Sequence, residues 1–174
     1  MGTLIKIPQK SDKEREKLTL HNLQRLIEYL KVQVQPPQFD MSELIEVTDT
    51  DCGTICCALG HAYEMDNPGF RQNFTELSNF LKFREGNKVL KWALKSFPAL
   101  YNIPKYNVSV DWWQIQENNA WYWVFESFWA DWEQNTIEDA VWRIEQLKKH
   151  GFEFFNDKGN WDYAPRKEFK HLEV

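Results

Sequence analysis

The feature that most constrains the fold is an apolar stripe near the start of the chain, in residues 12–34. Its side chains recur at three- and four-residue spacing, the period of an α-helix that buries one face. These apolar positions are Leu20, Leu23, Ile27, Leu30 and Val34. Ser11 and Glu14 have the spacing of a capping box, and Pro36 and Pro37 cannot continue a helix. The sequence therefore predicts a long amphipathic helix over Asp12–Val34.

A second capped helix is predicted over Ile137–His150. Thr136 and Asp139 repeat the capping-box spacing, and Gly151 follows basic residues that suit the negative end of a helix dipole. The apolar stripe of this helix is formed by Ala140, Val141, Ile144 and Leu147. An aromatic helix precedes it, with one face formed by Trp121, Val124, Phe125, Phe128, Trp129 and Trp132.

Shorter elements complete the expected fold. Helices are predicted over residues 75–83 and 87–97. Alternation favours a short strand over Asn107–Trp112, and an Asp-Lys-Gly turn favours a hairpin that pairs Phe152–Phe155 with Asn160–Tyr163. We therefore expect a mostly α, compact helical domain with at most one small β-hairpin or short strands.

Composition and charge narrow the class of protein. Hydrophobic residues make up 43% and charged residues 27% of the chain, which suits a globular domain with a core of its own. The net charge of −5 disfavours a protein whose main task is to grip extended nucleic acid. No apolar run approaches the roughly 18 residues of a transmembrane helix, and residues 1–10 lack a signal-peptide pattern. We expect a single globular domain over residues 1–174, located in the cytoplasm and without a membrane partner.

A cysteine-rich motif lies in residues 52–62, which read Cys-Gly-Thr-Ile-Cys-Cys-Ala-Leu-Gly-His-Ala. Gly53 permits an unusual turn, and Thr54 is predicted to cap a short buried helix over Ile55–Tyr63. Gly60 within this helix would let another element pack closely. An odd, clustered set of cysteines fits a reducing compartment and not a disulfide framework.

Two stretches resemble a loose group of uncharacterised phage and prophage accessory proteins. Residues 52–62 are similar to the group's Cys-Gly-Thr-x-x-Cys-x-x-Gly-His/Trp-Ala pattern, with Cys52 and Cys57 as the matching pair. Residues 121–151 are similar to its aromatic helix, Asn-Thr cap and Ala-x-x-Arg-Ile helix that ends in Gly. The resemblance implies a phage-borne protein of the bacterial host cytoplasm, and by association one that counters host defences. It implies no particular activity.

The same motif offers candidate residues for thiol or zinc chemistry: Cys52, Cys57 and His61. Cys57 and His61 share a helix face at four-residue spacing, and thiolate and imidazole are zinc ligands. Cys56 and Cys57, however, would point about 100° apart on a helix, so all candidate ligands cannot converge. No acidic or amide side chain is placed to orient His61. The sequence therefore favours a structural motif without metal or cofactor, and a thiol- or zinc-dependent enzyme stays as an alternative.

Aromatic residues are unusually dense, because seven of the nine tryptophans lie between Trp112 and Trp142. Tyr122 and Trp123 fall off the main apolar stripe of their helix, so they are candidates to line a ligand groove, whereas most of the rings are expected to build the core and a partner interface. Flat rings stack on nucleobases with about 1–3 kcal/mol per base, and helix-start amides and arginine bind phosphate. The predicted ligand-binding residues are Trp123, Tyr122, Trp129, Trp132, Thr54 and Arg143.

Three functions follow from these features. The first is a non-catalytic phage-type protein that binds and sequesters a small nucleotide-like signal of host immunity. The alternative is a protein-interaction module that inhibits or docks on a host or phage protein. The third is the thiol- or zinc-dependent enzyme built on Cys52, Cys57 and His61. The oligomeric state is open, a homo-oligomer included.

Overall fold

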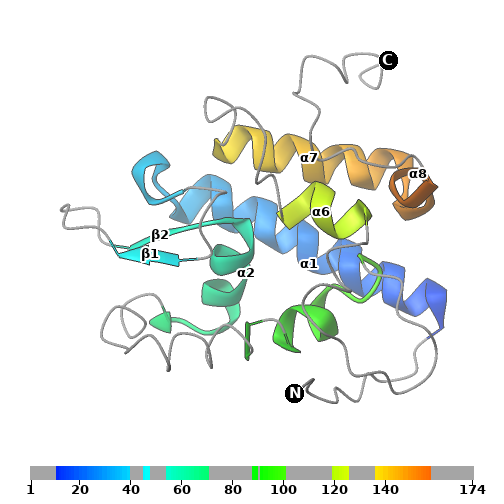
Figure 1. Ribbon diagram of the computed structural model, residues 1–174, viewed down its shortest axis with the longest axis horizontal. Coiled ribbons are helices and arrows are strands. Elements are labelled where there is room, and N and C mark those ends of the chain that lie inside the picture. The colour runs from blue at the N-terminus through cyan, green and yellow to red at the C-terminus, as the bar shows by residue number, and fades with distance from the viewer. Residues whose placement is uncertain are drawn as a thin grey trace.

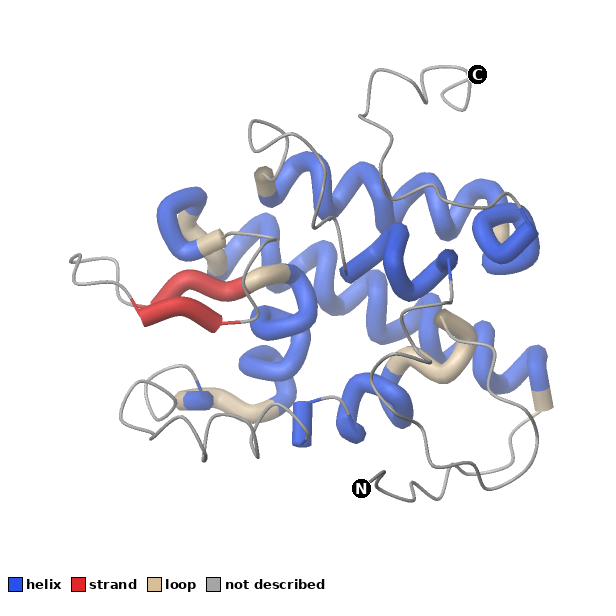
Figure 2. The backbone as a smooth tube through the Cα atoms, in the orientation of Figure 1, coloured by secondary structure: helices blue, strands red, loops and turns tan. Residues whose placement is uncertain are grey.

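The computed structural model describes part of the chain: residues 11–39, 45–47, 54–70, 88–89, 91–100, 119–125 and 136–157. Within this part the fold is mostly helical, with one two-stranded sheet (Figure 2). The helices are α1 (Asp12–Gln33), α2 (Ala58–Asp66), α6 (Asn119–Phe125), α7 (Ile137–His150) and α8 (Phe152–Asp157), with a 3-10 turn, η1 (Pro36–Gln38). Residues 88–89 and 91–96 are helical as well. The predicted fold class, a mostly α compact domain, is confirmed.

The long first helix, α1, forms as its sequence pattern predicts and runs through the centre of the molecule (Figure 1). The Ser11 hydroxyl accepts a hydrogen bond from the Glu14 N–H, and the Glu14 carboxylate accepts one from the Ser11 N–H at 2.9 Å. The helix ends where Val34 adopts extended backbone ahead of Pro36. Its apolar face is buried along most of its length, so α1 forms the centre of the hydrophobic core.

Helix α7 lies alongside α1 and runs in the opposite direction (Figure 1). Lys148 donates a hydrogen bond to Gln24, and Lys31 pairs with Glu145 at 3.7 Å. Residue numbers rise along α1 between these two contacts and fall along α7, so the helices are antiparallel. The predicted Thr136–Asp139 capping box is present. The helix stops at Gly151, whose φ of +84° lies in the left-handed region that glycine adopts without strain.

The sheet consists of β1 (Ile45–Val47) and β2 (Thr54–Cys56), which pair antiparallel with Ile45 opposite Cys56. The prediction that Thr54 caps a helix starting at Ile55 is therefore wrong. Thr54 lies in a strand, and α2 begins only at Ala58. One reason is that both strands contain β-branched residues, which favour extended backbone. The other is that the pairing with β1 gives hydrogen-bond partners to backbone groups of β2.

The predicted hairpin of Phe152–Phe155 is also wrong, because these residues are helical in α8. Phe152 and Phe155 are both buried, and residues three apart share a side of a helix but lie on opposite faces of a strand. The predicted helix over 75–83 and the predicted strand over 107–112 lie outside the described residues.

Three polar side chains on one face of α1 hold the end of the helix at residues 91–96. Arg15 donates two hydrogen bonds, of 2.6 and 3.1 Å, and Asn22 donates one of 2.7 Å, to backbone carbonyls within residues 96–99. The Thr19 hydroxyl accepts a backbone N–H from the same segment at 2.9 Å. These bonds satisfy groups that a helix end leaves without partners, so α1 fixes the position of this helix. None of the described helices has the length and apolarity that a membrane crossing requires.

Candidate functional site

The motif residues that the structure describes lie in the interior, at the start of α2. Cys57 is 4% exposed and His61 is 0% exposed, and Gly60 between them is also buried. Cys57 takes the position before the first residue of α2, and its carbonyl accepts the His61 N–H at 3.0 Å. Cys52 and Gly53 lie outside the described residues.

His61 joins α2 to the segment that follows α1. Its Nε2 lies 2.9 Å from the carbonyl oxygen of Gln38, and because a carbonyl only accepts, Nε2 carries the proton in this contact. The imidazole stacks on Phe39, with ring centroids 5.8 Å apart and planes 13° apart, and Tyr29 of α1 lies at 6.3 Å. His61 therefore links three elements of the core.

This geometry bears on the thiol and zinc alternatives. A general base must reach its substrate directly or through one water, and the His61 side chain has no exposed surface from which to do so. Within the described ranges, no three His, Cys, Asp or Glu side chains are grouped so that they could hold a metal ion. His61 and Cys57 pack in the core, and the side chains of Cys52 and Cys56 lie outside the part of the chain that the structure describes.

The structure brings Trp123 and Arg143 together, as neighbours, but places both inside the protein. The Trp123 indole N–H donates to the carbonyl oxygen of Arg143 at 2.7 Å, and an Arg143 N–H donates to the carbonyl oxygen of Trp123 at 3.3 Å. The guanidinium carbon lies 5.2 Å from the centroid of the Trp123 ring, within cation–π range. Each side chain thus bonds to the backbone of the other residue.

Of the two interpretations of the aromatic rings, Trp123 fits core packing and not a groove, because its side chain is 0% exposed. Phe155 of α8 lies 4.7 Å from its ring centroid and Trp142 of α7 lies at 5.8 Å. The expectation assumed that α6 buries one stripe. In fact α6 contacts α2, α7 and α8, and its described side chains, Ala120, Trp121, Trp123, Val124 and Phe125, are all buried. Trp129, Trp132 and the Tyr122 side chain lie outside the described residues.

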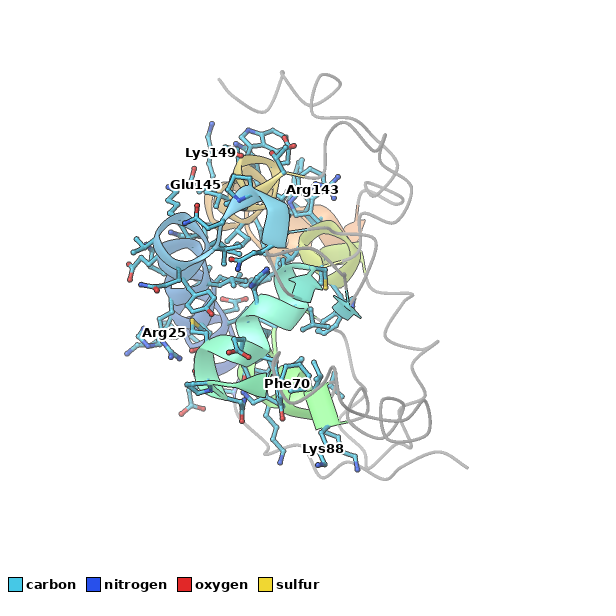
Figure 3. The ribbon with its side chains drawn as sticks, turned by 90° about the vertical axis from the view of Figure 1, so that its left-hand side faces the viewer. Arg25, Phe70, Lys88, Arg143, Glu145 and Lys149 are labelled. Carbon is cyan, nitrogen blue, oxygen red and sulfur yellow. The ribbon has the colours of Figure 1, made fainter. Side chains whose placement is uncertain are left out.

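The structure shows a second aromatic cluster, which the sequence reasoning missed. Tyr63 of α2 contacts Phe70 at 4.6 Å and Trp92 at 5.2 Å between ring centroids, and all three side chains are half-buried. Asp66 accepts from the Trp92 indole N–H at 3.3 Å and from Arg25 at 2.7 Å. This cluster lies at the end of the molecule opposite α7, where Figure 3 shows Phe70 and Lys88. No local pattern in the sequence indicates this cluster, because Tyr63 and Trp92 are far apart along the chain.

Comparison with known proteins identifies no relative from which a function could be inferred. No family model, no curated protein and no solved structure matches this chain significantly. The resemblance of residues 52–62 and 121–151 to phage accessory proteins remains a prediction. Function is therefore inferred from the contacts and exposure of the described side chains.

Proposed function

We propose that this chain is a non-catalytic protein-interaction module of the phage accessory type, which docks on or inhibits a host or phage protein. One observation carries the proposal: three described side chains that the sequence offers for chemistry or ligand binding are used in the core. Trp123, Arg143 and His61 are each less than 9% exposed. A protein-interaction module of this kind recognises its partner protein through the outer faces of its helices.

Sequestration of a nucleotide was the first expectation, and it needs a ring face and anion-binding amides open to a ligand. Trp123 is enclosed by Phe155, Trp142 and Arg143, so its ring offers no face to a base. Thr54 lies in a strand, so its backbone does not supply the amides of a helix start. These facts weaken the nucleotide hypothesis and favour the interaction module.

The packing of the scaffold supports the same proposal. Two capping boxes fix the starts of α1 and α7, and side chains of α1 hold the end of the helix at residues 91–96. Rigid helices hold an interface in one geometry, so that little conformational entropy is lost when a partner binds. The outward-facing positions of α1 are charged or polar except for Val32, which is 69% exposed, and a polar rim around exposed apolar side chains is typical of protein interfaces.

Native mass spectrometry of the chain purified from a bacterial cytosol, compared with its mass after denaturation, tests the proposal. We expect the chain's own mass without a small-molecule adduct, together with a complex that contains one identified protein. That complex should form again from the two purified components at fixed stoichiometry.

Two outcomes would contradict the interaction module. Extra mass equal to a nucleotide, lost on denaturation, would support sequestration and name the ligand class. Extra mass near that of zinc, lost in the Cys57→Ser variant, would support the thiol or zinc alternative.

A further inference from the structure

We draw no further inference here: the strongest candidate, the half-buried aromatic surface patch of Tyr63, Phe70 and Trp92 between α2 and the helix at residues 91–96, carries no proposal because nothing in the structure shows what covers it.

Discussion

Trp123 and Trp92 each lie in a cluster of aromatic rings, and the two clusters differ in what covers them. Around Trp123, α7 and α8 supply Trp142, Arg143 and Phe155, and no part of the Trp123 side chain reaches solvent. Around Trp92, the ring partners are the half-buried Tyr63 and the buried Phe97, and Trp92 itself remains half-buried. The indole N–H of Trp123 donates to a backbone carbonyl, whereas that of Trp92 donates to a carboxylate.

The comparison teaches that a ring's place on its own helix does not decide its exposure. Trp123 falls off the main stripe of α6 and is buried, because other helices cover that side as well. Trp92 lies beside the buried Ala93 on its helix and keeps part of its surface, because α2 covers it from one side. The number of neighbouring elements, and not the stripe, determines which rings can meet a partner.

Trp123→Ala is expected to have the largest effect and tests whether Trp123 is buried while Trp92 is not. Removing a fully buried tryptophan leaves a cavity and breaks its hydrogen bond, so the free energy of unfolding should fall by about 3–5 kcal/mol. Urea unfolding followed by circular dichroism measures this change. A loss below about 1 kcal/mol would mean that the ring is exposed in solution and would restore it as a candidate for ligand stacking.

A smaller loss is expected for Arg143→Met, which keeps most of the side-chain volume. The Trp123 carbonyl lies in the last turn of α6, where helical carbonyls lack intrahelical partners, and it would lose the Arg143 N–H. Leaving a buried carbonyl unsatisfied costs about 1–3 kcal/mol of unfolding free energy. Arg143→Lys serves as the control and should recover part of the loss. Unchanged stability in Arg143→Met would show that the Arg143 side chain does not help to hold α6 to α7, since the bond from the Trp123 indole to the backbone carbonyl of residue 143 remains.

The smallest stability effect is expected for Trp92→Phe in the half-buried cluster of Tyr63, Phe70 and Trp92. The substitution retains a six-membered ring against Tyr63 but removes the hydrogen bond to Asp66 and part of the half-buried indole, so the free energy of unfolding should fall by about 0.5–1.5 kcal/mol. Differential scanning fluorimetry beside Trp123→Ala compares the two sites directly. A larger destabilisation by Trp92→Phe than by Trp123→Ala would reverse the assignment of core and surface.

Local signals in the sequence predicted the regular elements well where caps and periodicity agree. The bounds of α7, its Thr136–Asp139 box and its end at Gly151 are as predicted, and α1 differs from prediction only at its last residue. These features involve side chains within one turn of each other, which the sequence lists side by side. The wrong predictions, a helix from Ile55 and a hairpin of Phe152–Phe155, concern elements that depend on distant residues. β2 forms with its partner strand β1, and α8 forms against the core that buries Phe152 and Phe155.

The candidate site was less predictable than the fold. Burial of His61 and Cys57 agrees with the structural interpretation of their motif, but the contact of His61 with Gln38 joins residues 23 positions apart and has no local signal. The Trp123–Arg143 pair joins residues 20 positions apart, and the contact between Tyr63 and Trp92 spans a similar gap. Contacts across such separations depend on how helices pack.

The sequence by itself determined where the capped helices begin and end, because hydrogen bonds and apolar periods within a few residues suffice for that. Only the tertiary structure decided which aromatic and basic side chains are enclosed and which remain outside. The Arg143 guanidinium carbon lies 5.2 Å from the Trp123 ring centroid in the core, whereas Lys95, three positions after Trp92, is exposed. The physical reason is that the burial of a residue depends on all the elements that pack around it. No single stretch of the sequence contains all of these elements.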